Sequence, residues 1–182
     1  PNMQQDVRES LAAAEVYVRY CTSETEKAAL LFTYLAERFP YQQGDSRTPV
    51  YSALCQGVAN SKSMAQSWQL LCDEAGLSCR TVSGLRGGEA YWWNIVTLDG
   101  VSCHVDVLRD LLDGSTLRLR YDEDMAGGYY WDAEDVPACP APAPEEEEPE
   151  APAPTEDQPA SEDPAEDPAE TPEAQPTEPE TP

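Results

Sequence analysis

A few residues of this chain have the side chains that acyl-transfer chemistry requires. His104 is the only histidine, and Asp106 follows it by two residues, so both lie on the same face if the segment is a strand. Ser61 and Cys55 supply a hydroxyl and a thiol, the two common protein nucleophiles. Serine, histidine and aspartate together provide a nucleophile, a base and a group that orients the base. The sequence therefore raises two hypotheses for amide hydrolysis or acyl transfer, one through Ser61, His104 and Asp106 and one through Cys55.

Ser61 lies at the predicted start of a helix. Apolar side chains then recur with the period of a helix, at Met64, Trp68, Leu71 and Cys72. Asn60 and Ser61 are both favoured N-cap residues, and Gly76 is typical of a C-terminal stop. The simplest interpretation of Ser61 is therefore an N-cap hydroxyl that bonds free backbone N–H groups.

A hairpin positions the other candidates. Asp99-Gly100 lies between two segments rich in β-forming residues, which predicts a two-residue turn. The register set by this turn places Ile95 opposite His104, and makes Tyr91 and Asp106 diagonal neighbours about 7–8 Å apart between backbones. We therefore expect the tips of Tyr91 and Asp106 to meet, whereas His104 lies farther from Tyr91. One face of the hairpin is apolar and should meet the core, while the face that carries His104 is mixed.

The remaining patterns place helices before strands. Apolar spacing predicts one helix over about 6–20 and a second over 23–39, followed by a loop at 41–49. Short β-like segments follow the central helix, at 79–82, 91–98, 101–107 and 117–121. The predicted fold class is α+β, with N-terminal helices and a central helix packed on a small antiparallel sheet.

Several motifs resemble the transglutaminase-like superfamily, which has the papain-type cysteine-enzyme fold. The run SKSMAQSWQLLCDEAGL at 61–77 resembles its central helix, which a nucleophilic cysteine opens. YWWNIVTLDG at 91–100 resembles its His-x-Trp-Asn strand, and HVDV at 104–107 resembles its Val-Asp-Val-Thr strand. The stretch YSAL at 51–54 is similar to the segment before the nucleophile. The order and spacing of these motifs extend the resemblance over about residues 10–110.

The resemblance implies which residues occupy the catalytic positions. In that superfamily a cysteine thiolate attacks an amide, a histidine carries the proton and an aspartate holds the histidine ring. Here Ser61 stands at the nucleophile position and Tyr91 at the base position, and only Asp106 is retained. A serine hydroxyl needs a positioned base, and a phenol with a pKa of about 10 is protonated near neutral pH. We therefore expect the chemistry to fail, with Tyr91 donating a hydrogen bond to Asp106.

Aromatic residues near these positions are candidates for ligand binding. Trp92 and Trp93, together with Asn94 and His104, are the predicted binding residues, and 127–131 is a candidate aromatic lip. Aromatic rings offer a large contact area at a low cost in conformational entropy. Packing in the core is the alternative interpretation for all of them.

The composition of the chain changes after Cys139. Residues 140–182 hold 15 of the 35 acidic residues, 13 of the 17 prolines and neither Lys nor Arg, which leaves −9 of the net charge of −24 to residues 1–139. A segment that cannot bury apolar surface does not offset its chain entropy, so we expect one folded domain over 1–139 and a disordered acidic tail or linker over 140–182. The acidity disfavours nucleic-acid binding, and the lack of a long apolar run predicts no membrane insertion.

The cysteines bear on the compartment and on metal binding. Their even number, six, is compatible with disulfides and favours an extracellular or cell-surface location, although buried free thiols are the alternative. A start at Pro1 rather than Met favours a processed or truncated product. A single histidine and the lack of CxxC spacing predict no metal site, and no cofactor is expected.

The preferred hypothesis is a catalytically degraded transglutaminase-like domain that binds a peptide, protein or glycan on a secreted or surface bacterial protein. The first alternative is an active amide hydrolase or acyl transferase that works through Ser61, His104 and Asp106 or through Cys55. The second alternative is a purely structural domain. Modification of Ser61 or Cys55 by a reactive probe distinguishes the enzyme from the other two.

Overall fold

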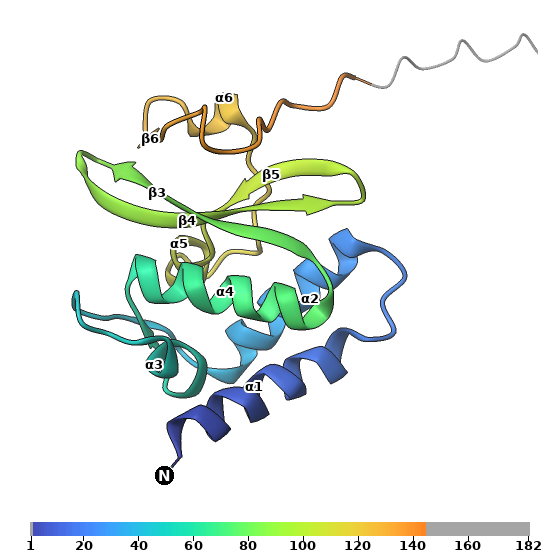
Figure 1. Ribbon diagram of the computed structural model, residues 1–182, viewed down its shortest axis with the longest axis vertical. Helices are drawn as coiled ribbons and strands as arrows, with labels where there is room; N and C mark the ends of the chain where they lie inside the picture. The colour runs from blue at the N-terminus through green and yellow to red at the C-terminus, as the bar shows by residue number, and fades with distance from the viewer. Residues whose placement is uncertain (1, 145–182) are drawn as a thin grey trace, which may run out of the picture. The chain divides into compact units, whose positions relative to one another are not determined.

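The computed structural model describes residues 2–144, and these contain helices followed by a mainly antiparallel sheet (Figure 1), which confirms the predicted α+β class. In chain order the elements are α1 Met3–Val18, α2 Glu24–Arg38, β1 Gln42–Gln43, α3 Val50–Cys55, β2 Val58–Ala59, α4 Ser61–Ala75, β3 Ser78–Arg86, β4 Glu89–Leu98, β5 Val101–Val105, α5 Val107–Leu112, α6 Asp122–Met125 and β6 Tyr129–Tyr130. Most of the predicted acidic tail, residues 145–182, lies outside the described residues, so that part of the domain organisation stays a prediction.

The larger sheet is built on the predicted hairpin. Its strand order is β5-β4-β3-β6, all antiparallel, and Ile95 pairs with His104 as the register predicted. The turn residues Asp99 and Gly100 have φ of 51° and 85°, the left-handed conformation that a two-residue hairpin needs. The Asp99 carboxylate also accepts bonds from the backbone N–H groups of Glu24 and Thr25, each at 3.0 Å. The hairpin tip therefore holds the first turn of α2, where a negative charge is favourable.

Helix α4 lies between the sheet and the N-terminal helices (Figure 1). Its buried stripe contains the predicted residues Met64, Trp68, Leu71 and Cys72. These side chains belong to one apolar cluster with residues from α1, α2, α3, β4 and β5. The apolar face of the hairpin thus meets the core, as the alternation of side chains predicted.

The ends of α4 are set by local bonds. Asn60 is the N-cap, because its side chain accepts from the Ser63 N–H at 2.7 Å and the Ser63 hydroxyl accepts from the Asn60 N–H at 3.0 Å. Gly76 ends the helix with a φ of 75°. Of the two predicted caps, Asn60 is therefore correct, and Ser61 is the first helical residue.

The second face of the sheet is buried as well, which agrees with core packing, the alternative interpretation of the aromatic segment 127–131. A second cluster contains Val82, Trp93, Ile95, Met125, Tyr129 and Cys139, because the chain after α5 returns across this face through α6 and β6. Strand β6 pairs with the end of β3, where Leu85 is opposite Tyr130. A Cβ atom at Gly84 would lie 2.1 Å from the Tyr130 carbonyl oxygen, so the close approach of β6 requires glycine there.

Two predicted strands are wrong in detail, and three short elements before α4 were not predicted. The strand predicted over 101–107 ends at Val105, because the Asp106 side chain accepts from the Arg109 N–H at 3.2 Å and caps α5. The strand predicted over 117–121 is reduced to a single bridge between Arg120 and His104. Helix α3 and the parallel pair β1 and β2 were not predicted, since each is too short to show a period.

All six cysteines, which lie within the described residues, are free thiols. Cys72, Cys103 and Cys139 are buried, and burial raises the pKa of Cys103 to about 11. These three side chains pack as small apolar groups. The extracellular location therefore stays a prediction, without disulfides to support it. Within residues 2–144, the helices lack the length and apolar character that a membrane crossing requires.

Candidate functional site

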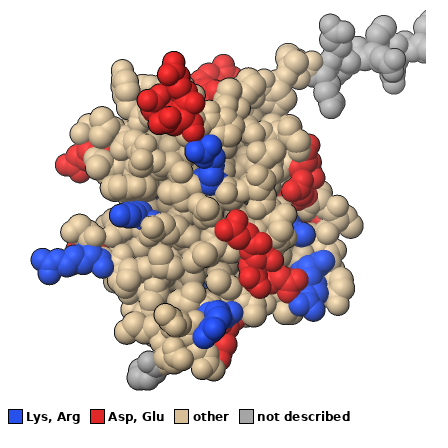
Figure 2. All heavy atoms as spheres, viewed as in Figure 1, with Lys and Arg blue, Asp and Glu red and all other residues tan. Residues whose placement is uncertain are grey.

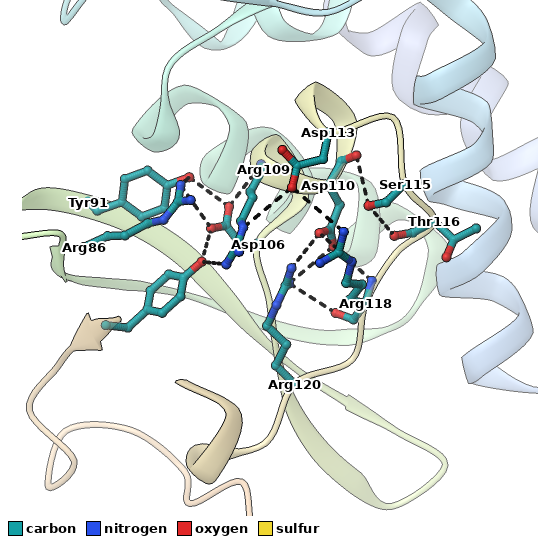
Figure 3. A network of polar contacts seen from close by, with 11 residues as sticks. Arg86, Tyr91, Asp106, Arg109, Asp110, Asp113, Ser115, Thr116, Arg118 and Arg120 are labelled. Atoms are coloured by element: carbon teal, nitrogen blue, oxygen red, sulfur yellow. Dashed lines mark hydrogen bonds and ion pairs between the residues drawn. The ribbon is translucent and has the colours of Figure 1, made fainter. Parts of the chain in front are cut away.

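The first turn of α4, strand β4 and the junction between β5 and α5 meet at the predicted site. The Ser61 hydroxyl accepts from the backbone N–H of Trp92 at 3.3 Å, which places Ser61 beside Tyr91 along the chain of β4. The Tyr91 hydroxyl donates to Asp106 Oδ1 at 2.9 Å (Figure 3), as the hairpin register predicted. The structure therefore brings Ser61, Tyr91 and Asp106 to one region of the fold.

The Asp106 carboxylate is fully engaged in this region. Besides Tyr91, it accepts from the Tyr129 hydroxyl at 2.6 Å and from the backbone N–H of Arg109 at 3.2 Å. Arg86 Nη1 lies 4.0 Å from Asp106 Oδ2, and the Asp106 side chain is only 2% exposed. These donors place the Asp106 carboxylate at the centre of a polar network. Among the described residues, no imidazole is bonded to it.

The two phenols of the network remain protonated at neutral pH. Burial raises the pKa of Tyr91 well above its ordinary value, and the charge of Asp106 and the hydrogen bond to it raise it further. Burial and Asp106 raise the pKa of Tyr129 in the same way. A phenol whose pKa lies well above 7 keeps its O–H group at neutral pH. In this form it can donate a hydrogen bond, but it does not act as a base. Neither tyrosine can take the proton of the Ser61 hydroxyl.

The alternative triad of Ser61, His104 and Asp106 is wrong. His104 is completely buried, and its Nδ1 accepts from the Trp93 Nε1–H at 3.0 Å. Its Nε2 lies 2.8 Å from Asp122 Oδ1, so both ring nitrogens are bonded to residues other than Ser61 and Asp106. The reason is that the strand ends after His104 and Val105, and the returning chain with α6 covers the histidine.

His104 lies in the one described cluster of three side chains that resembles a metal site. The ligand atoms of His104, Asp122 and Cys139 all lie within 4.8 Å of one another. However, indole nitrogen only donates, so the Trp93 bond leaves the proton of the neutral ring on Nε2, which donates to Asp122. The nitrogen that faces the cluster thus has no free lone pair, whereas a metal-binding histidine donates from its other nitrogen. The geometry does not fit a metal ligand.

The burial of His104 predicts a pH dependence of stability. Burial lowers its pKa below the ordinary 6.5, and the hydrogen bond to Asp122 only partly opposes this. His104 therefore takes up a proton at a higher pH in the unfolded chain than in the folded chain. The contribution of neutral His104 to the free energy of unfolding is present above about pH 6.5 and is lost as the pH falls towards the folded pKa. We expect the free energy of unfolding of the native protein to decrease between pH 7.5 and pH 5.5.

Urea unfolding at both pH values, in the native protein and in His104→Gln, measures this contribution. The decrease should be smaller in the variant, because no other histidine titrates in that window. The histidine NMR signal gives the folded pKa directly. Equal pH dependence in both proteins, or a folded pKa above 6.5, contradicts the prediction.

Cys55 is a poor nucleophile. It ends α3 and is half-buried, and burial raises the pKa of its thiol more than Arg38 lowers it. A reactive cysteine needs a lowered pKa, since the thiolate is the attacking species. The geometry therefore gives the Cys55 hypothesis no support.

The predicted binding residues separate into two groups. Trp93, Asn94 and His104 are buried, so the prediction that they contact a ligand at the surface is wrong. The Asn94 side chain instead donates to the Ala65 carbonyl at 2.9 Å and joins β4 to α4. Trp92 is half-buried and lines a surface pocket of about 520 Å³ with residues of α4 and with Val50 and Thr81. Of the four, Trp92 alone remains a candidate for contact with a ligand.

Of the residues other than Tyr91 in the network around Asp106 (Figure 3), the sequence analysis named only Tyr129, as part of the aromatic segment 127–131, and missed the rest. Arg86, Arg109 and Tyr129 surround Asp106, and the buried Asp110 pairs with Arg120 nearby. The sequence did contain a signal for Arg86, which directly precedes Gly87-Gly88. This dipeptide is typical of a two-residue hairpin turn, and a turn there pairs Gly84 with Tyr91, as observed. The positions of Arg109 and Tyr129 carry no comparable signal, because they depend on the return of the chain after α5.

Comparison with known proteins gives one family. The family model described as the Transglutaminase-like superfamily matches residues 12–107. Among solved structures, a candidate cysteine protease from Cytophaga hutchinsonii is similar, with a TM-score of 0.47 and 10% sequence identity. The alignment covers 68% of this chain and 46% of that protein, so the chain spans about half of its length. No curated protein sequence matches the chain.

Proposed function

Because the chain belongs to the transglutaminase-like superfamily, we propose that residues 2–144 form a member without catalytic activity that binds a peptide segment beside the first turns of α4. The observation that carries the proposal is the engagement of Asp106 by Tyr91, Tyr129 and the Arg109 backbone. None of the three donors that bond to the Asp106 carboxylate is an imidazole ring, so the carboxylate has no histidine base to orient. The region retains a cleft beside the nucleophile position and lacks a base there.

The pocket beside α4 supports a peptide as the ligand. Two of the residues that line it are Lys62 and Trp92, which directly follow Ser61 and Tyr91. Lys62 Nζ lies 5.6 Å from the centre of the Trp92 ring. Leu70 adds apolar surface, and Gln66 and Asp73 add hydrogen-bonding groups. An aromatic surface flanked by amide and charged groups suits a short peptide, whose backbone needs donors and acceptors and whose side chains need apolar contact.

Reactive probes test the loss of catalysis. The native protein is incubated with a fluorophosphonate and with iodoacetamide, and labelled residues are identified by mass spectrometry. We expect Ser61 and Cys55 to react no faster in the folded protein than in the denatured protein, because no described residue acts as a base on Ser61 and burial outweighs the effect of Arg38 on Cys55. Faster labelling of either residue in the folded protein contradicts the proposal.

Arrays of random nine-residue peptides and of glycans test the binding. We expect peptide binding that falls at least about tenfold in Trp92→Ala, since a central aromatic residue usually dominates such a contact. Tyr20→Ala is the matched control, because Tyr20 is 88% exposed and does not line the pocket. Binding to glycans alone contradicts the peptide proposal, and silence on both arrays favours the purely structural domain.

A further inference from the structure

We propose that a second pocket, formed by the β3–β4 turn, β6 and α5, binds a small ligand through its carboxylate group. We call it the arginine pocket, after Arg86 and Arg109 in its wall. It has a volume of about 650 Å³ and shares no lining residue with the pocket beside α4. The inference is therefore independent of the proposed peptide binding.

The two guanidinium groups of the arginine pocket are held in place by the aromatic network behind them. Arg86 donates to the Tyr91 hydroxyl at 3.3 Å, and its Cζ lies 5.1 Å from the centre of the Tyr91 ring. Arg109 donates to the Tyr129 hydroxyl at 3.1 Å. Figure 3 shows both arginines on either side of Asp106. Positions fixed in this way reduce the conformational entropy that a ligand must offset.

Both guanidinium groups keep donors for a ligand. Their side chains are 36% and 32% exposed, and each group carries five N–H donors. Among the described residues, each makes one side-chain hydrogen bond, to Tyr91 for Arg86 and to Tyr129 for Arg109. Asp113 lies 3.7 Å from Arg109 Nε and is itself 47% exposed, and so it is a weak competitor in solvent.

The residues that line the arginine pocket include two positive side chains, Arg86 and Arg109, and none that is negative, although the domain is acidic. The carboxylate between the two arginines, Asp106, is 2% exposed and engaged by the two tyrosines, so it does not reach the pocket. Residues 1–139 as a whole carry a net charge of −9, and Asp and Glu side chains lie at several places on the face in Figure 2, so the domain repels extended polyanions. The ligand that fits is therefore a small anion that enters the pocket, rather than a nucleic acid or a polyanionic surface.

The walls of the arginine pocket specify the rest of the ligand. Tyr130 is 75% exposed and Leu85 is 44% exposed, and they pair across β3 and β6. The glycine pairs at 87–88 and 127–128 leave the floor open, since a Cβ at any of them would have nothing within 4 Å. A planar carboxylate matches the fork of a guanidinium group, and an apolar body can lie on Tyr130. The pocket thus favours a carboxylate joined to an apolar or ring-shaped group.

Titration with N-acetyl-phenylalanine, its amide and inorganic phosphate tests the inference by NMR. We expect the carboxylate to bind and the amide and phosphate to bind at least about tenfold more weakly, because the amide loses the charge-assisted hydrogen bonds and phosphate has no apolar ring to lie on Tyr130. Arg86→Gln and Arg109→Gln should each lower the affinity at least about tenfold. Arg47→Gln removes the same charge from an exposed loop and should leave the affinity unchanged.

Tyr130→Ala keeps the test decisive if an arginine variant unfolds. This substitution changes an exposed side chain and should weaken N-acetyl-phenylalanine more than acetate. Equal affinity for the carboxylate and the amide, or tighter binding of phosphate, overturns the inference. Unchanged affinity in folded Arg86→Gln and Arg109→Gln overturns it as well, whereas the loss of peptide binding in Trp92→Ala reports only on the pocket beside α4.

Discussion

Substitution of Arg120 by leucine is expected to lower the free energy of unfolding by about 3–5 kcal/mol, because it leaves a buried carboxylate without its partner. The side chain of Asp110 is fully buried, and Arg120 Nη2 lies 2.6 Å from its Oδ1 (Figure 3). Asp110 also accepts from the backbone N–H of Arg118 at 2.9 Å. That bond remains in the variant, and so does the ion pair with the half-exposed Arg118 side chain, whose Nε lies 3.8 Å from Asp110 Oδ1, but neither replaces the close and buried guanidinium of Arg120.

Urea unfolding followed by tryptophan fluorescence measures the loss. Arg19→Leu is the matched control, because Arg19 pairs with Glu15 on the surface of α1 and should change the free energy by less than about 1 kcal/mol. The double variant Asp110→Asn with Arg120→Leu should regain part of the stability, since it removes the isolated charge. If the double variant is as unstable as Arg120→Leu, the cost does not come from the buried carboxylate.

The parts of the fold that the sequence predicted well are those decided by neighbouring residues. Asp99-Gly100 determines its turn by backbone conformation alone, so the register and the meeting of Tyr91 with Asp106 followed directly. Helix α4 was likewise decided locally, by its apolar period and by the glycine that ends it. Even the position of its first residue was uncertain only by the choice between two adjacent N-cap residues, Asn60 and Ser61.

The parts that could not be predicted depend on residues far apart in the chain. His104 could be placed on the correct face of β5 but not under its cover, because Trp131 and Asp122 reach it only when the chain returns across the sheet. The same return brings Tyr129 to Asp106. A period of two residues tells which face a side chain occupies, and says nothing about what covers that face.

This difference explains why three of the four predicted binding residues are buried in the structure. Trp92 and Trp93 look alike in the sequence, yet they point to opposite faces of β4. Trp93 is buried with His104 and Tyr129, and Trp92 reaches the pocket beside α4. The choice between them required knowing that both faces of the sheet are covered and that only one keeps a pocket beside Ser61.

Restoration of the superfamily residues should return reactivity to the site. In the double variant Ser61→Cys with Tyr91→His, iodoacetamide is expected to alkylate Cys at position 61 about 10 to 100 times faster at pH 6.5 than in Ser61→Cys alone. The first turn of a 15-residue helix favours a thiolate, and a histidine on the adjacent strand adds a base or a positive charge. The contact between Ser61 and the Trp92 backbone shows that α4 and β4 lie close enough for this pairing.

The pH profile of alkylation separates activation from simple exposure. In the double variant the rate should begin to rise at least about one pH unit below the rise in Ser61→Cys, because the thiolate forms at a lower pH when a histidine is its partner. Ser61→Cys with Tyr91→Phe is the matched control, since it opens the same space without an imidazole, and it should resemble Ser61→Cys. Equal rates and equal profiles in all three variants would mean that the side chain at position 91 does not face position 61, and would contradict the assignment of these two positions as a nucleophile and its base.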